Sequence, residues 1–144
     1  MLSDYRYHLK VERNLSVNSV SAYCSDISHY MENAGSNVAK ARGKDIAAFL
    51  STLSCKIGRR SQARTISALR SFYDFLILEG ERKDNPCDSI DNPKIGRRLP
   101  EVLSVDEVEA IIASVHTDSW QGLRDRAILE LLYGCGLRVS EACT

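Results

Sequence analysis

One segment, from about Ser61 to Glu79, constrains the fold more than any other because its character changes along its length. Its first half, with the residues just before it, is polar and basic, whereas its second half is apolar almost all round. A helix that is apolar on every side is normally buried. The pattern therefore predicts a central core helix whose N-terminal half emerges at a surface. Its expected core residues are Phe72, Tyr73, Phe75, Leu76, Ile77 and Leu78.

The remaining strong signals are also helical. Apolar residues recur at helical spacing after Ser16, a residue type that caps helix N-termini, and an amphipathic segment follows Asp45. A short helix is predicted before Ser16, and Gly80 is placed to end the central helix. The N-terminal part of the chain is therefore predicted to form a four- to five-helix bundle.

A proline-containing stretch divides the chain. Residues 81–103 hold all three prolines, and proline blocks helix formation. After this stretch, Ser104 and Glu107 form a capping box that opens the first of three further predicted helices. The sequence thus predicts an all-α protein in three parts, which are a bundle over residues 1–92, a linker over 93–103 and a second helical part over 104–144.

Positive charge is concentrated in two places, although the net charge of the chain is zero. Residues 40–70 carry eight Lys or Arg against Asp45 alone, and residues 94–98 carry three and no acid. Such concentration indicates a polyanionic partner, with a solvated basic face as the alternative. The candidate contacts are Arg59, Arg60, Gln62 and Arg64 before and within the central helix, Asn18 and Ser19 at the second helix start, and Lys94, Arg97 and Arg98 in the linker.

Several classes of protein are disfavoured by composition. No apolar run approaches the roughly 20 residues that a membrane span needs, and the N-terminus has no signal-peptide core. The five cysteines form no CxxC pair, which favours reduced thiols in the cytoplasm over a disulfide framework. The three histidines show no metal-ligand spacing, so neither a metal site nor a cofactor is predicted.

One further motif lies near the end of the sequence. Arg138 follows Gly136 by two residues at a predicted helix start, and Glu141 stands three residues on. A guanidinium can hold two oxygens of one phosphate, and an acid at this spacing can orient it. A weak surface ion pair is the ordinary alternative.

Taken in order, several blocks of the sequence resemble the tyrosine site-specific recombinases, or phage integrase family, and most of all their Xer (XerC/XerD) type. Each block is weak alone, but together they span nearly the whole chain. The blocks are LSVNSV at 15–20, ISALRSFY at 66–73, LSVDEV at 103–108, RDRAILELLY at 124–133 and GLRVSE at 136–141.

The resemblance implies a SAM-like core-binding domain on double-stranded DNA, its fourth helix at a major groove, followed by the truncated start of a catalytic domain. In this family a tyrosine attacks the scissile phosphate to form a 3′-phosphotyrosyl link, protomers act together, and no metal or nucleotide is needed. Arg138 matches the first of two catalytic arginines. The sequence holds no His-x-x-Arg and no match to the catalytic lysine or tyrosine. These 144 residues are therefore expected to bind DNA without cutting it.

Two alternatives stay open at this point. A mobile-element integrase of the same family shares these motifs, and a non-enzymatic helical module for binding DNA or protein would share the helical pattern. A His-x-x-Arg and a tyrosine beyond Thr144 would favour an enzyme over such a module.

Overall fold

The computed structural model describes residues 1–34, 38–94, 96 and 102–143, which contain helices and turns but no strand. The all-α prediction is confirmed in these ranges. The chain divides into two compact units, Met1–Gly96 and Arg97–Thr144. The first contains α1 (Leu2–Tyr7), the π-helical η1 (His8–Glu12), α2 (Val17–Ala34), the 3₁₀ turn η2 (Val38–Lys40), α3 (Gly43–Ser54) and α4 (Arg59–Leu78), and the second contains α5 (Val105–Ala113), α6 (Trp120–Gly134) and α7 (Val139–Ala142).

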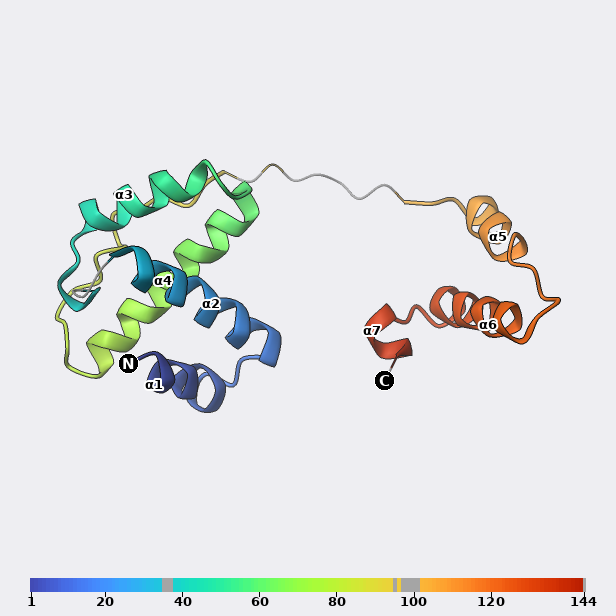
Figure 1. The fold of residues 1–144 in the computed structure, drawn as a ribbon, viewed down its shortest axis with the longest axis horizontal. Coiled ribbons are helices and arrows are strands. Elements are labelled where there is room, and N and C mark those ends of the chain that lie inside the picture. The colour runs from blue at the N-terminus through green and yellow to red at the C-terminus, as the bar shows by residue number, and fades with distance from the viewer. Residues whose placement is uncertain (35–37, 95, 97–101, 144) are drawn as a thin grey trace. The chain divides into compact units, whose positions relative to one another are not determined.

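Helix α4 is the central element of the N-terminal unit, where it packs against α2 and α3 (Figure 1). Phe72 is fully buried and meets the ring of Tyr5 edge-on at a centroid distance of 5.2 Å, so α1 also covers α4. The sequence prediction was wrong for Leu78, which is 71% exposed, and Ile77 is only half-buried. Leu78 lies one turn after the exposed Asp74, on the solvent-facing side of α4, whereas Phe75 and Leu76 in the same turn are buried. The fully buried large side chains are Tyr5, Leu9, Ile27, Tyr30, Ile46, Ile66, Leu69, Phe72, Tyr73, Leu76 and Cys87.

The end of α4 follows from a single glycine. Gly80 adopts a φ of +75°, a conformation that most L residues resist, and its amide donates to the Ile77 carbonyl at 3.0 Å. The amide of Glu81 donates to the Leu76 carbonyl at 3.0 Å. These two bonds form a Schellman motif, which confirms that Gly80 ends the helix.

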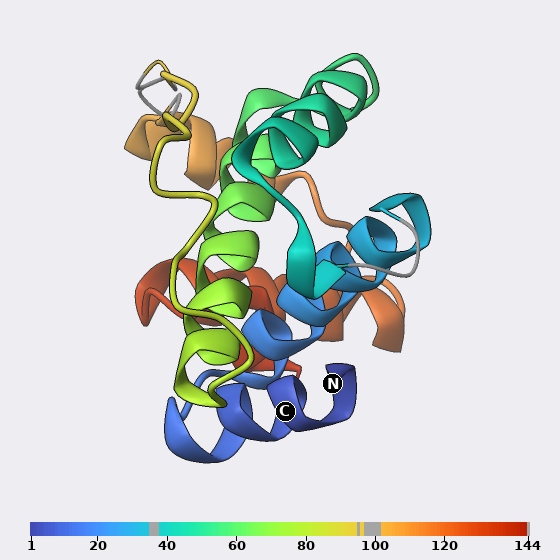
Figure 2. The same ribbon diagram turned by 90° about the vertical axis from the view of Figure 1, so that its left-hand side faces the viewer.

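The segment that follows α4 returns along the same helix (Figure 2). Arg82 donates to the Ala39 carbonyl at 2.8 Å, and Asn85 donates to the Arg70 carbonyl at 3.1 Å. Arg70 in turn donates to the carbonyl of Ile90. The beginning of the proline-containing stretch is therefore bound to the bundle by side-chain hydrogen bonds.

Burial separates the cysteines into two groups with different expected reactivity. Cys24 and Cys87 are buried, whereas Cys55, Cys135 and Cys143 are exposed. Burial raises the pKa of Cys87 to about 12, and the thiolate is the reactive form. At about pH 8, a thiol reagent should therefore modify the three exposed cysteines quickly and Cys87 only after unfolding, as peptide mass spectrometry would show. Modification of Cys87 at the rate of Cys55 in native protein would contradict this assignment.

In the second unit, the capping box at the start of α5 is confirmed. The amide of Ser104 donates to Glu107 Oε2 at 2.8 Å, and the amide of Glu107 donates to Ser104 Oγ at 3.3 Å. Among the described residues of this unit none is buried, and Leu123 and Leu131 are 57% and 52% exposed. These helices are therefore stabilised by local signals, such as the capping box, more than by packing in a core.

This difference in burial predicts a difference in hydrogen exchange. Amides in α5 and α6 should exchange faster than those in the buried half of α4, because opening a helix with little buried apolar surface exposes little to water. Exchange followed by mass spectrometry on peptides from the two units would measure the contrast. Protection in α6 equal to that around Phe72 would be the contrary result.

Candidate nucleic-acid interface

The start of α4 carries a cluster of exposed positive charge. Gly58, the residue before the helix, is extended, with φ −69° and ψ 157°, and Arg59 and Arg60 are the first two helical residues. The helix thus begins two residues earlier than predicted, which places both arginines within it. Lys56 lies just before them in the turn after α3, and all three cationic side chains are exposed. We call Lys56, Arg59 and Arg60, together with Arg64 one turn further on, the basic cluster.

The basic cluster is electrostatically unfavourable for the helix that carries it. The N-terminus of a helix bears partial positive charge, so a cation there costs about 0.3–1 kcal/mol. The first turn of α4 contains no acidic residue, and Gly58 offers no capping side chain. Among the described residues, neither the Arg59 nor the Arg60 side chain has a hydrogen bond or an ion pair. An external anion would relieve this repulsion, and the surface is open to receive one.

Arg64 differs from its neighbours because it already has a partner. Its Nε donates to Asp26 Oδ2 at 2.9 Å and its Nη2 donates to Asp26 Oδ1 at 3.0 Å, so the pair joins α4 to α2. The hydrogen bonds that Arg64 donates to Asp26, and then the negative charge of Asp26, raise the pKa of Arg64. Gln62, another candidate contact, is half-buried.

Asp26 was not among the residues singled out from the sequence as candidate contacts. A signal was present, because Asp26 lies three residues after Tyr23 and four before Tyr30, beside the apolar stripe of α2, where a carboxylate needs a partner. The identity of that partner, 38 positions away in the chain, depends on how the two helices cross.

The two residues predicted at the start of the second helix do lie there. Helix α2 begins at Val17, and Ser16 Oγ accepts the amide of Ser19 at 3.3 Å, which confirms Ser16 as the cap. Asn18 is exposed and Ser19 is half-buried. In Figure 1 both α2 and α4 begin on the right-hand side of the N-terminal unit and cross within it. Asn18 and the basic cluster thus belong to helix ends on one side of this unit.

The linker contributes one described candidate. Lys94 is exposed, two residues beyond Asn92, whose Oδ1 accepts from Arg70 Nη1 at 3.4 Å. The chain at Lys94 therefore leaves the bundle close to α4. The other two linker candidates, Arg97 and Arg98, lie outside the described residues.

Arg138 occupies the position before the first residue of α7, as the sequence predicted. Its side chain is 81% exposed, and its Nη1 contacts Glu141 Oε1 at 3.1 Å. The backbone amide of Arg138 donates to Glu141 Oε2 at 2.8 Å. The predicted pairing of Arg138 with Glu141 is therefore present, and the guanidinium is accessible. A catalytic role for Arg138 stays a prediction.

Three of the six tyrosines are core residues rather than candidate nucleophiles. Tyr5, Tyr30 and Tyr73 are completely buried, and burial raises the pKa of each hydroxyl. The hydroxyls of Tyr30 and Tyr73 lie 2.7 Å apart, and Tyr73 also donates to the Val38 carbonyl at 3.1 Å. A hydroxyl held inside the bundle in this way cannot reach a phosphate at the surface.

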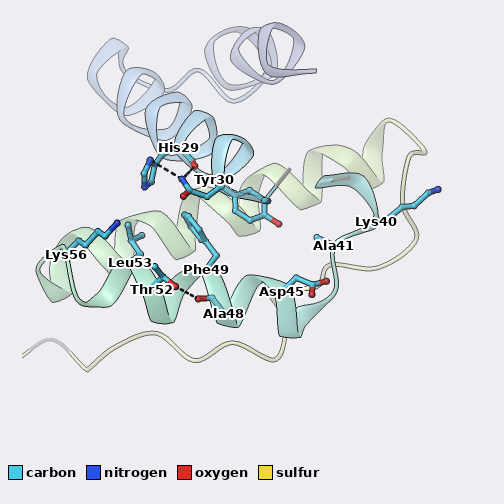
Figure 3. A pocket seen from close by; sticks show the side chains of 12 residues that line it. His29, Tyr30, Lys40, Ala41, Asp45, Ala48, Phe49, Thr52, Leu53 and Lys56 are labelled. Atoms are coloured by element: carbon cyan, nitrogen blue, oxygen red, sulfur yellow. Dashed lines mark hydrogen bonds between the residues drawn. The ribbon is translucent and has the colours of Figure 1, made fainter. Parts of the chain in front are cut away.

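A hollow of about 540 Å³ opens between α2, η2 and α3, with Phe49 and Tyr30 among its apolar lining (Figure 3). Lys56 of the basic cluster is at one end of it and Lys40 is at the other (Figure 3). Within the described ranges, no three His, Cys, Asp or Glu side chains are grouped to hold a metal. No helix found there is long and apolar enough to cross a membrane.

Two family models match successive parts of the chain. The model for the phage integrase N-terminal SAM-like domain matches residues 2–80, and the model for the phage integrase family matches residues 101–144. The first match includes α1 to α4 and the basic cluster, and the second includes Arg138. The chain therefore belongs to the phage integrase family, the tyrosine site-specific recombinases.

Individual relatives and a solved structure agree with this assignment. The chain is 40% identical over 144 residues to the tyrosine recombinase XerD of Lacticaseibacillus casei, covering 98% of this chain and 49% of the relative. It is 38% identical over 143 residues to the tyrosine recombinase XerC of Pelobacter propionicus, covering 95% and 47%. The integrase from mycobacterium phage Brujita shares the fold, with a TM-score of 0.62, 23% identity, and coverage of 98% of this chain and 47% of that one. The chain thus spans about half the length of the proteins it matches.

Proposed function

We propose that these 144 residues bind double-stranded DNA through the start of α4, as the DNA-binding portion of a tyrosine recombinase. The observation that carries the proposal is the pair Arg59 and Arg60, which are exposed and have no partner among the described residues, at a helix start without an acid. They lie in the part of the chain that matches the SAM-like domain. Two adjacent arginines whose side chains have no internal partner suit the phosphates of DNA.

The same proposal assigns roles to the parts of the chain. Residues 1–92 form the core-binding domain, 93–103 the linker and 104–144 the start of the catalytic domain. Asn18, Ser19, Lys94, Arg97 and Arg98 are further contacts to the DNA backbone. The whole protein, acting in the cytoplasm with further recombinase protomers, cuts and rejoins strands through a 3′-phosphotyrosyl intermediate. Arg138 stabilises the negative charge that develops on the phosphate, as a preorganised guanidinium can.

Fluorescence anisotropy on a labelled mixed-sequence duplex tests DNA binding directly. If the contacts are to phosphates, the logarithm of the binding constant should fall linearly with the logarithm of the salt concentration, by about 0.9 for each phosphate neutralised. Binding that does not respond to salt, or no binding at low salt, would overturn the proposal.

Cleavage is expected to be absent from these residues alone. They contain Arg138 but no His-x-x-Arg, and Tyr5, Tyr30 and Tyr73 are buried. On a nicked suicide duplex, which traps a phosphotyrosyl intermediate, denaturing gel electrophoresis should show no covalent protein–DNA band. A band that disappears on Tyr7→Phe or Tyr133→Phe substitution would assign a nucleophile to one of the exposed tyrosines and contradict this expectation.

A chromosomal Xer-type role is favoured over a mobile-element integrase by two of the relatives, which are named XerD and XerC. The likeness to a phage integrase rests on 23% identity and concerns the fold alone. Recombination by the whole protein at a chromosomal site, as opposed to a site at the end of a mobile element, would distinguish these roles.

A further inference from the structure

We infer that Asp26 is a positioning residue of the DNA interface, which holds Arg64 in the orientation that meets DNA. The inference rests on the proposed DNA-binding function. It gives a negatively charged residue, Asp26, a supporting role at a surface that binds a polyanion. It predicts that removing this negative charge weakens DNA binding.

The ion pair between Asp26 and Arg64 is anchored at its acidic end. The Asp26 side chain is 12% exposed and lies on α2, whereas the Arg64 side chain is 48% exposed. Helices α2 and α4 pack together, and Ile27, next to Asp26, is fully buried. The carboxylate is therefore the fixed partner, and the guanidinium is the part that reaches solvent.

The geometry of the pair leaves a defined edge of Arg64 available. A guanidinium has five N–H donors, and Asp26 uses one on Nε and one on Nη2. The remaining donors, on Nη1 and the outer side of Nη2, point away from Asp26 because the group is planar and rigid. Their direction is fixed before DNA arrives, so less side-chain freedom is lost on binding than for a free arginine.

The free edge of the Arg64 guanidinium lies on the same face of α4 as another residue of the basic cluster. Arg60 and Arg64 are four residues apart on α4 and therefore lie on the same face. Arg60 has no partner within the described ranges, whereas Arg64 is held. We assign a different part to each, with Arg60 as a mobile phosphate contact and Arg64 as an oriented one on a phosphate or a base edge.

The sign of the Asp26 effect separates this account from plain electrostatics. An acid near a DNA-binding surface repels phosphates, so its removal should strengthen binding if charge alone mattered. An acid that only competes with DNA for Arg64 predicts the same strengthening. A positioning role predicts the opposite, a loss of affinity of roughly 3- to 10-fold, which corresponds to immobilising one long side chain.

A double-mutant cycle tests the inference by anisotropy on a mixed-sequence duplex, with wild type, Asp26→Ala, Arg64→Ala and the double variant. We expect Asp26→Ala to weaken binding and the double variant to bind as Arg64→Ala does. Glu32→Ala, which removes an exposed acid elsewhere on α2, is the matched control and should leave affinity unchanged or slightly higher. Thermal unfolding of each variant fixes a temperature at which all are folded.

A second pair of variants keeps the test independent of stability. Asp26→Asn preserves shape but removes the charge and one of the two acceptor oxygens, and Arg64→Lys keeps a cation but cannot form the two-point contact. Both should weaken binding. Equal or tighter binding by Asp26→Ala and Asp26→Asn would overturn the inference while leaving DNA binding in place, and so would a full Asp26 effect in the Arg64→Ala background. No binding by wild type would overturn the inference and the proposed function together.

Discussion

Replacing Arg59 and Arg60 together with alanine should weaken DNA binding by at least roughly 100-fold, since each charged hydrogen bond removed is worth about 1.5–3 kcal/mol and each 1.4 kcal/mol is a factor of ten. The salt dependence should flatten at the same time, by about 0.9 for each phosphate that the protein no longer neutralises. The helix itself should become slightly more stable, because two cations are removed from its N-terminus. Anisotropy titrations across a series of salt concentrations measure affinity and slope together.

The matched control is the double variant Arg6→Ala and Lys83→Ala, which removes the same charge from two other exposed positions in the N-terminal unit. Its affinity should fall by only a few-fold, because distant charges contribute through a screened field. Equal losses of affinity in the two double variants would show that net charge, and not the start of α4, governs binding.

Replacing Phe72 with alanine should destabilise the N-terminal unit by about 3–5 kcal/mol, because apolar burial is removed and a cavity is left behind. Phe72 is completely buried, and its ring centroid lies 5.2 Å from that of Tyr5 and 5.6 Å from that of Tyr73. Urea unfolding followed by near-ultraviolet circular dichroism of the buried tyrosines measures the change.

Leu78→Ala provides the control on the same helix. Leu78 is 71% exposed, so its removal should change the free energy of unfolding by less than about 0.5 kcal/mol. If Leu78→Ala were as destabilising as Phe72→Ala, the assignment of Leu78 to the solvent-facing side of α4 would be wrong.

Local patterns in the sequence were sufficient for most of the helices. The Ser16 cap, the Ser104–Glu107 capping box and the Gly80 termination all depend on residues within one turn of each other, and all three are present. The start of α4 was misplaced by two residues because Gly58, which has no side-chain cap, is a weak signal. Leu78 was misassigned because the apolar run hid the exposed face that it shares with Asp74, one turn earlier.

Features that depend on the packing of distant segments could not be predicted in this way. The Arg64–Asp26 pair joins residues 38 positions apart, and its formation depends on where α2 crosses α4. Likewise, proline and asparagine correctly predicted the absence of helix after Gly80, but the attachment of that segment through Arg82 and Asn85 depends on carbonyls of η2 and α4. The basic character of the candidate interface was visible in sequence, and the distinction between paired and unpaired arginines was not.

The most direct test of the account is to map the DNA-binding surface on the protein by nuclear magnetic resonance. Isotope-labelled protein titrated with a mixed-sequence duplex should show its largest amide shift changes at residues 56–64 and around Asn18, at helix starts on one side of the N-terminal unit. The amides around Gly80, at the opposite end of α4, should change little. Shift changes that concentrate around Gly80, or in the second unit with none near Arg59 and Arg60, would contradict the assignment of DNA binding to the start of α4.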